Sequence, residues 1–414
     1  MAKNNNSSNS LSYYAWQRIK KNKLAMFGLI IIVLCMIVAL LGYAITPDSS
    51  PDANTQLLEI AKKRPGFNVK MLQVRKNGFS HKTNFFNKML FGEISDYTPI
   101  PILDYRFEAD KIIVKAYTEK NKSAAEEMDF NIADIVYAVN YNMPIVINAQ
   151  NSSIEFNEFG TNKQITKAIQ EVRKEIVDHN IITKTFILGT DPVGRDLLSR
   201  LIIGTRISFS VGFISVFISL LIGMSLGAIA GFFRGKVDHF IVWVINVIWA
   251  IPTLLLVIAI TLVLGKGFWQ VFVAVGLTMW VEVARVVRGQ VLSLREKEFI
   301  EAGRALGFKN MRIIFRHVLP NVMGSVIIIS AANFASAILT EAGLSFLGIG
   351  AQPPTASWGA MISAHRGYII SDMPYLAFLP GVAIMIMVLA FVLLGNGLRD
   401  ALDTKSVDED QIMI

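Results

Sequence analysis

The sequence predicts an all-α polytopic membrane protein of six transmembrane helices, with an α+β domain inserted between the first helix and the second. Of its 414 residues, 53% are hydrophobic and only 17% are charged, whereas a soluble domain carries about a quarter charged residues. The charge is missing from a few long blocks. One long stretch of mixed character, 47–188, separates the first block from the rest, which indicates membrane spans with a soluble insertion.

Six apolar blocks are predicted to cross the membrane. A helix needs about 20 apolar residues to do so, and backbone groups in lipid must be hydrogen-bonded within their own segment. The blocks are 24–46, 207–233, 240–265, 268–285, 318–340 and 373–398. The first is interpreted as an uncleaved anchor rather than a signal peptide, because its core is too long and no A-x-A site follows. Pro252 and Pro320 are expected to kink or begin helices.

The distribution of Lys and Arg predicts the direction of the spans, since short cytoplasmic loops are enriched in both. The leader 1–23, the turn at 234–236 and the stretch 285–316 are basic, whereas the loop 348–374 holds only Arg366. Both termini, including the acidic tail 404–414, are therefore expected in the cytoplasm, and 47–188 on the outer face.

The outer segment 47–188 is expected to form a small α+β domain. β-favouring runs at Lys111–Tyr117 and Pro144–Asn148 alternate with turn residues. Lys163–His179 has apolar residues at helical spacing and predicts an amphipathic helix. The segment is long enough to bury a core of its own. His81 and His179 are isolated, so no metal site is predicted there.

Several other classes of function are disfavoured. Nucleic-acid binding is disfavoured, because the net charge of +8 comes from residues that flank apolar blocks and not from a basic patch interleaved with aromatics. Ser225 fits G-x-S-x-G by letter, but it lies in an uncharged span without the strand–turn–helix context of a nucleophile elbow. The phosphate-binding pattern G-x-x-x-x-G-K-[ST] is missing, so this chain is not expected to hydrolyse ATP itself. No catalytic residue and no metal site are predicted, and Cys35, the only cysteine, allows no intrachain disulfide.

The most informative stretch, 298–321, lies in the loop between the fourth and fifth spans. A helix-compatible segment carries Phe299, Ala302 and Leu306 and breaks at Gly307, and a second amphipathic stretch runs from 311 to 318. Such an element either lies flat on the bilayer or docks in the groove of a partner.

Four further motifs accompany this stretch. Glu301-Ala302-Gly303, Gly307 and Leu319-Pro320 resemble the EAA loop of binding-protein-dependent ABC importer permeases, which usually have alanine where Gly303 stands. The four further motifs resemble segments of the dipeptide, oligopeptide and nickel permeases of that family, in particular of their C-type subunit. They are the segments 189–196, 340–348, 352–359 and 397–403. The long outer segment 47–188 departs from the family pattern.

The resemblance implies the type I ABC importer permease fold for 189–403, with the loop 286–317 as the coupling segment that docks in a cytoplasmic ATPase. It assigns that coupling to Glu301, Ala302, Gly303, Ala305, Leu306, Gly307, Leu319 and Pro320. Glu301 would pair with a basic residue of the ATPase, and Gly307 would allow a sharp turn.

The partners and the location follow from the same resemblance. They are a homologous second permease, two ABC ATPases that use ATP and Mg²⁺, an extracytoplasmic substrate-binding protein, and the cytoplasmic (inner) membrane of a bacterium. This chain itself would bind no cofactor. The expected activity is import of di- or oligopeptides by alternating access. The alternatives are import of nickel or another small solute on the same scaffold, and a membrane-anchored receptor that acts through its outer domain.

Three polar residues in or at the ends of spans are candidates for the translocation path: Glu282, Asn333 and Glu341. Ionisable groups in a membrane are costly and by default face a cavity or a partner. The alternatives are that Glu282 is neutralised by Arg285 and Arg288, one and two turns away, and that Glu341 has a structural role at the outer end of the fifth span.

Overall fold

The computed structural model describes residues 11–80, 83–119, 125–148, 152–161, 163–265 and 267–402. It contains two compact units: a helical unit, residues 1–39 with 204–414, and a mixed unit, residues 40–203. The acidic tail 404–414, the first ten positions of the leader and His81 lie outside the described residues.

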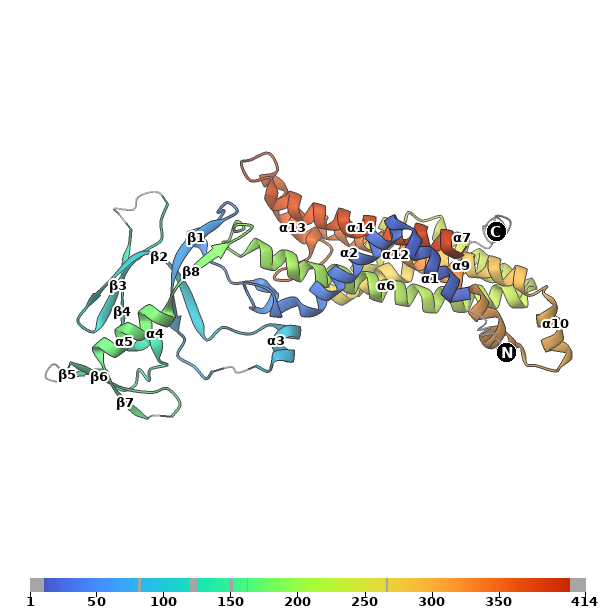
Figure 1. Cartoon of the computed structure of the whole chain (residues 1–414). Helices are drawn as coiled ribbons and strands as arrows, with labels where there is room; N and C mark the ends of the chain where they lie inside the picture. The colour runs from blue at the N-terminus through green and yellow to red at the C-terminus, as the bar shows by residue number, and fades with distance from the viewer. Residues whose placement is uncertain are drawn as a thin grey trace, which may run out of the picture. The chain divides into compact units, whose positions relative to one another are not determined.

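Within the described residues, five helices are long and apolar enough to cross a membrane, and a bent pair makes a sixth if it is one span. Figure 1 labels the helices. Those of the membrane region are α1 (Leu11–Lys21), α2 (Lys23–Leu41), α6 (Leu197–Phe233), α7 (Gly235–Trp249), α8 (Thr253–Leu264), α9 (Phe268–Leu294), α10 (Glu298–Ala305), α11 (Asn310–Ile313), α12 (Leu319–Phe346), α13 (Trp358–His365) and α14 (Tyr375–Leu402).

The third predicted span, 240–265, is two helices rather than one. α7 ends at Trp249, α8 begins at Thr253, and their axes are bent by 92°. Pro252 is the cause, because it has no backbone N–H to donate and disfavours helical dihedrals at Ile251. It precedes α8 in an extended conformation.

Two other helices extend beyond their apolar blocks. α6 begins at Leu197 instead of 207, and α9 continues to Leu294 instead of 285. Two arginines at this end of α9 have partners on α7: Arg288, in the extension, makes two hydrogen bonds to Asp238, at 2.6 and 2.7 Å, and Arg285, just before it, donates to Asn246 at 3.1 Å. Hydropathy finds the part of a helix that lipid surrounds, whereas the helix ends where its hydrogen bonding ends.

The glycines of α6 serve helix packing. A Cβ on Gly223, Gly227 or Gly231 would lie 2.5–2.8 Å from atoms of α9. The three positions share one helical face, and the missing side chains let the two backbones approach closely.

The mixed unit contains two antiparallel sheets. Five strands lie in the order β4-β3-β2-β1-β8, and three in the order β5-β6-β7. The strands are β1 (Phe67–Arg75), β2 (Tyr97–Glu108), β3 (Lys111–Ala116), β4 (Glu127–Asn131), β5 (Val146–Asn148), β6 (Ser153–Asn157), β7 (Gln164–Ala168) and β8 (Ile181–Phe186), and the short helices are α3 (Phe85–Phe91), α4 (Ile132–Val136) and α5 (Ile169–Glu175). The β-favouring runs at 111–117 and 144–148 fall on β3 and β5.

The helix predicted over Lys163–His179 is only partly helical. Residues 164–168 form β7, with Ile165 opposite Phe156 of β6, and the helix begins at Ile169. Ile165 and Ile169 both pack on one core that contains Val172 and Ile176. Apolar residues four apart suit a helix, but β-branched residues that alternate with polar ones also suit a strand. Residues 164–168 form a strand because β6 lies beside them and pairs with them.

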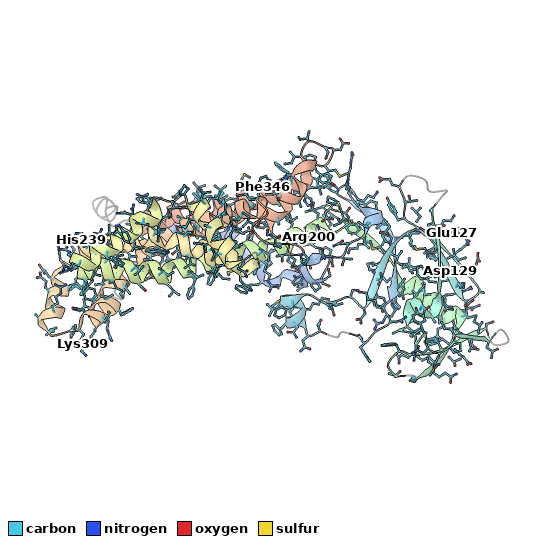
Figure 2. All side chains as sticks on the ribbon, turned by 180° about the vertical axis from the view of Figure 1, so that it is seen from behind. Glu127, Asp129, Arg200, His239, Lys309 and Phe346 are labelled. Carbon is cyan, nitrogen blue, oxygen red and sulfur yellow. The ribbon has the colours of Figure 1, made fainter. Side chains whose placement is uncertain are left out.

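The outer edge of the large sheet is β4, which carries paired charges. Glu127 accepts two hydrogen bonds from Arg106, both at 2.8 Å, and Asp129 accepts one from Lys111 at 2.7 Å. Figure 2 labels both carboxylates. These contacts lower the pKa of Glu127 and of Asp129. Charged side chains on an edge strand discourage pairing with another chain.

Candidate functional site

The predicted coupling segment, 286–317, contains an amphipathic helix, α10. Its inner face carries Ile300, which is 1% exposed, and Gly303, which is buried. Ile300 joins a core cluster with residues of α6, α9 and α12. The adjoining face leaves Phe299 45% and Leu306 72% exposed, with Ala302 also exposed. α10 therefore presents a small apolar surface while Ile300 packs it against the bundle.

α10 ends in a turn that requires glycine. Gly307 has φ +74° and donates to the Arg304 carbonyl at 2.9 Å, and Phe308 donates to the Gly303 carbonyl at 3.0 Å. A left-handed residue followed by such a pair of bonds is a common way to end a helix. Lys309, labelled in Figure 2, follows this turn at the far end of the helical unit. Figure 1 places α10 and α13 at opposite ends of that unit.

Cationic side chains fix the coupling segment to its neighbours. The guanidinium of Arg304 lies 5.4 Å from the centre of the Phe232 ring, and Arg295 donates to the Phe232 carbonyl at 2.5 Å. Arg312 stacks over Phe308 at 4.3 Å. A displacement of α10 would thus be passed to the ends of α6 and α9.

The remaining predicted coupling residues lie as follows. Glu301 and Ala305 are exposed, and the Glu301 carboxylate makes no ion pair within the part of the chain that the structure describes. Leu319 and Pro320 form the first positions of α12, where the missing N–H of proline costs nothing. The stretch just before them, Ile314–Val318, is a π-helical turn that sequence patterns did not indicate.

Among the path candidates, Glu282 lies on a cavity of about 220 Å³ in the helical unit. The wall of this cavity includes Trp249, Thr253, Thr278, Ser336 and Thr340. Glu282 is exposed. Its two expected partners are engaged elsewhere: Arg288 binds Asp238, and Arg285 binds Asn246 and covers the Trp249 ring.

Glu341 is buried and belongs to a hydrogen-bonded group at the end of α12. The Ser345 hydroxyl donates to the Glu341 carboxylate at 2.6 Å and accepts from the Ala351 N–H at 3.2 Å. Ser357 caps α13 by accepting from the Ala360 N–H. Gly359 lies so close to α12 that a Cβ there would be 2.6 Å from Ala342. The family-like segments 340–348 and 352–359 thus form one structure.

Asn333 is 1% exposed in the middle of α12. Both polar atoms of its amide lack a hydrogen-bond partner among the described residues. An unsatisfied buried amide costs about 1–3 kcal/mol. Neither Asn333 nor Glu341 lines the cavity at Glu282.

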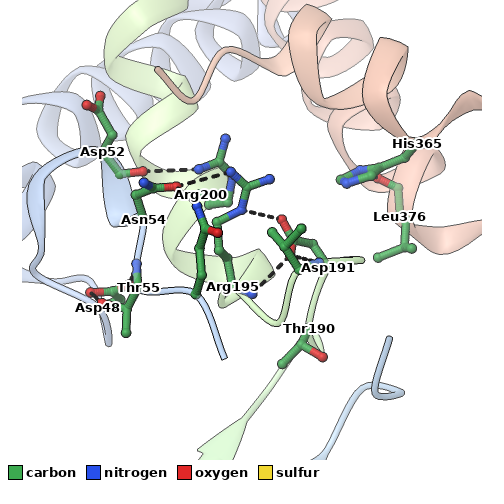
Figure 3. Close-up of polar contacts among 12 residues, drawn as sticks. Asp48, Asp52, Asn54, Thr55, Thr190, Asp191, Arg195, Arg200, His365 and Leu376 are labelled. Carbon is green, nitrogen blue, oxygen red and sulfur yellow. Dashed lines mark hydrogen bonds and ion pairs between the residues drawn. The ribbon is translucent and has the colours of Figure 1, made fainter. Parts of the chain in front are cut away.

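The segment 189–196 forms a clasp within the mixed unit (Figure 3). The Thr190 hydroxyl donates to the Ile60 carbonyl at 2.5 Å and accepts from the Lys63 N–H at 2.8 Å. Asp191 is fully buried and binds the Arg195 guanidinium at 2.6 Å. A Cβ on Gly194 would lie 1.7 Å from the Leu57 carbonyl oxygen, so no other residue fits there.

The clasp brings together the two ends of the β-rich region. Phe67, the first residue of β1, is paired with Phe186, the last residue of β8. Gly66 and Gly189 each donate to the Phe186 carbonyl at 3.0 Å. The chain therefore enters and leaves this region at one point.

Sequence reasoning did not find the hydroxyls of the cavity. A signal was present, because Thr278 and Glu282 are four residues apart on α9, and Ser336 and Thr340 are four apart on α12. That spacing places each pair on one helical face. Polar pairs at helical spacing inside apolar spans indicate a wet surface.

Comparison with known proteins gives two family matches. Residues 223–407 match the binding-protein-dependent transport system inner membrane component, and residues 10–61 match the N-terminal TM domain of oligopeptide transport permease C. Most of the β-rich region lies between them.

Three curated relatives agree. The glutathione transport system permease protein GsiD of Pectobacterium atrosepticum is 44% identical over 221 residues, 53% of this chain and 72% of that protein. The oligopeptide transport system permease protein OppC of Bacillus subtilis is 41% identical over 223 residues, which are 54% of this chain and 73% of that protein. The dipeptide transport system permease protein DppC of Alkalihalophilus pseudofirmus is 44% identical over 217 residues, which are 52% of this chain and 71% of that protein. The resemblance is confirmed, and the chain belongs to the inner-membrane permease subunits of binding-protein-dependent ABC importers.

Proposed function

We propose that this permease passes di- or oligopeptides inward across the bacterial inner membrane. The relatives that it resembles are named for oligopeptides, dipeptides and the tripeptide glutathione. Both termini and the coupling segment face the cytoplasm, and the mixed unit is an α+β domain on the outer face. The basic residues on one set of loops support this orientation.

The observation that carries the proposal is the exposed apolar face of α10, formed by Phe299, Ala302 and Leu306. Soluble surfaces rarely keep such residues together unless they meet a partner. Glu301 beside this face has a carboxylate without an ion pair in the described residues and suits a basic residue of the partner. The partners are two cytoplasmic ABC ATPase subunits, which use ATP and Mg²⁺.

Transmission of force follows from how α10 is held. Ile300 packs with Ile313, Val291 and Val318, so α10 is bound to the adjoining ends of α9 and α12. These two helices also supply Glu282, Ser336 and Thr340 to the cavity. Movement of the ATPases therefore reaches the wall of the path through rigid helices, which is the usual form of a domain rearrangement. A second permease subunit completes the path, and an extracytoplasmic binding protein delivers the peptide.

Co-purification of the assembled importer tests the coupling role. Glu301→Lys reverses the charge on the docking face, and Gly307→Pro breaks the turn that ends α10. Both variants are expected to lose the ATPases while the second permease stays bound. Asp372→Lys makes the same charge change at an exposed residue of the loop 366–374 and is expected to leave the complex intact. ATPases that remain bound to both α10 variants would contradict the docking role.

A further inference from the structure

Two of the hydroxyls that line the cavity at Glu282 donate their hydrogens to backbone carbonyls. The Thr340 hydroxyl donates to the Ser336 carbonyl at 2.8 Å, and the Thr278 hydroxyl donates to the Val275 carbonyl at 2.8 Å. The hydroxyl hydrogens of Thr278 and Thr340 are thus used within their own helices. What these side chains have left is oxygen lone pairs, and the Glu282 carboxylate, when ionised, accepts only.

No described residue forms an ion pair with the Glu282 carboxylate. It takes part in no ion pair or side-chain hydrogen bond among the described residues, and the arginines one and two turns away are committed to Asn246, Trp249 and Asp238. It lies in α9, a candidate membrane span. A carboxylate in a membrane span is costly unless a cation or water contacts it.

The size of the cavity restricts what it can hold. About 220 Å³ is enough for the end of a peptide. The group that fits acceptors around one negative charge is a compact cation with several N–H donors. A primary ammonium, with three donors, is that group.

We propose that this cavity is the subsite of the translocation path that takes the N-terminal ammonium of the peptide. Glu282 supplies the countercharge, and the oxygens of Thr278, Ser336 and Thr340 supply further acceptors. The inference rests on the proposed peptide function and deepens it. It makes Glu282 a specificity-determining residue of the permease, separate from any choice that the binding protein makes.

Peptide uptake by the complete importer in proteoliposomes tests this assignment. One peptide is offered with a free N-terminus and, separately, with an acetylated N-terminus, each at saturating concentration with the same binding protein. Glu282→Gln is expected to reduce the preference for the free amine by roughly 10-fold or more, because a hydrogen bond to a charged group is lost. Glu282→Asp, which keeps the charge, is expected to retain most of the preference.

The hydroxyl side chains provide a second measurement. Ser336→Ala with Thr340→Val is expected to reduce the same preference several-fold while ATP hydrolysis still responds to the loaded binding protein. Ser330→Ala is the matched control, because Ser330 also lies on α12 and donates to its own helix at the Val326 carbonyl, but it does not line the cavity. This control is expected to keep the wild-type preference.

The outcomes separate the inference from the function on which it rests. A wild-type importer that transports both peptides, with the same preference in Glu282→Gln, overturns the ammonium subsite and leaves peptide import standing. Loss of the second permease from the Glu282→Gln complex also overturns it, since Glu282 would then be a subunit contact. A wild-type importer that hydrolyses ATP but transports neither peptide overturns peptide import and the subsite together.

Discussion

Gly303 and Gly307 lie four residues apart, yet their backbones make opposite demands. Gly303 is helical, and a Cβ there would make ordinary contacts with Phe308 at 3.5 Å and Ile313 at 3.9 Å. Gly307 has φ +74°, where a side chain is strained whatever the space. Only Gly307 needs to be glycine, and the alanine that is usual in the family fits at 303.

Gly303→Ala is therefore expected to stabilise α10 by up to about 1 kcal/mol, since glycine is that much poorer than alanine inside a helix. Gly307→Ala is expected to destabilise the turn by about 1–2 kcal/mol. Hydrogen exchange of the amides in 298–308 of the purified permease measures both changes. Equal protection in the two variants would mean that the turn is not left-handed.

Asn333 places an unsatisfied amide in the interior of α12. Asn333→Leu keeps a similar shape and removes both orphaned polar atoms, so it is expected to raise stability by roughly 1–3 kcal/mol. The midpoint of thermal unfolding of the purified complex measures the change. A lower midpoint would show that the amide has a partner in the assembled importer, as expected of a residue on the translocation path.

At the scale of elements, the clasp depends on a few buried hydrogen bonds. Thr190→Val keeps the volume of the side chain but leaves the Ile60 carbonyl and the Lys63 N–H without their partner. The expected cost is about 2 kcal/mol or more, because each buried unsatisfied group is expensive. Limited proteolysis at 47–65 reports this loosening. Thr185→Val alters a threonine whose hydroxyl bond is solvent-exposed and is expected to leave cleavage unchanged.

Elements also show where patterns suffice and where they do not. The apolar blocks located the membrane helices, because lipid imposes one long uniform stretch on each. They missed the extension of α9 to Leu294, since it depends on the partners that α7 offers to Arg288, whereas the bend follows from Pro252 itself. In the mixed unit, Ile165 sits in a strand because Phe156 is there to pair with it.

For the whole molecule, the β-rich region begins and ends at adjacent residues, as our proposal of an inserted outer domain requires. Phe67 and Phe186 are neighbours, so we expect the clasp at 189–196 to close with or without the strands between them. Insertions with adjoining ends disturb a host fold least.

Replacement of 67–186 by a short Gly/Ser linker is accordingly expected to leave assembly with the second permease and the ATPases intact. Size-exclusion chromatography of the purified importer checks the assembly, and ATP hydrolysis checks coupling. A variant with the linker and Thr190→Val is expected to assemble less well than the linker alone. Failure of the linker variant to insert or assemble would mean that the β-rich region supports the membrane helices.

The sequence by itself determined the class of protein, the number of apolar blocks and the family. Bilayer thickness requires long apolar stretches, and motifs such as Glu301–Gly307 are contiguous in the chain, so both can be read from the sequence. It also named Glu282, Asn333 and Glu341, since polar residues stand out in spans. Only the tertiary structure separated these three. Glu341 has Ser345 beside it, Asn333 has no partner in the described residues, and Glu282 meets Thr278, Ser336 and Thr340 on one cavity. Which groups meet across helices depends on packing between distant segments, and no local pattern records it.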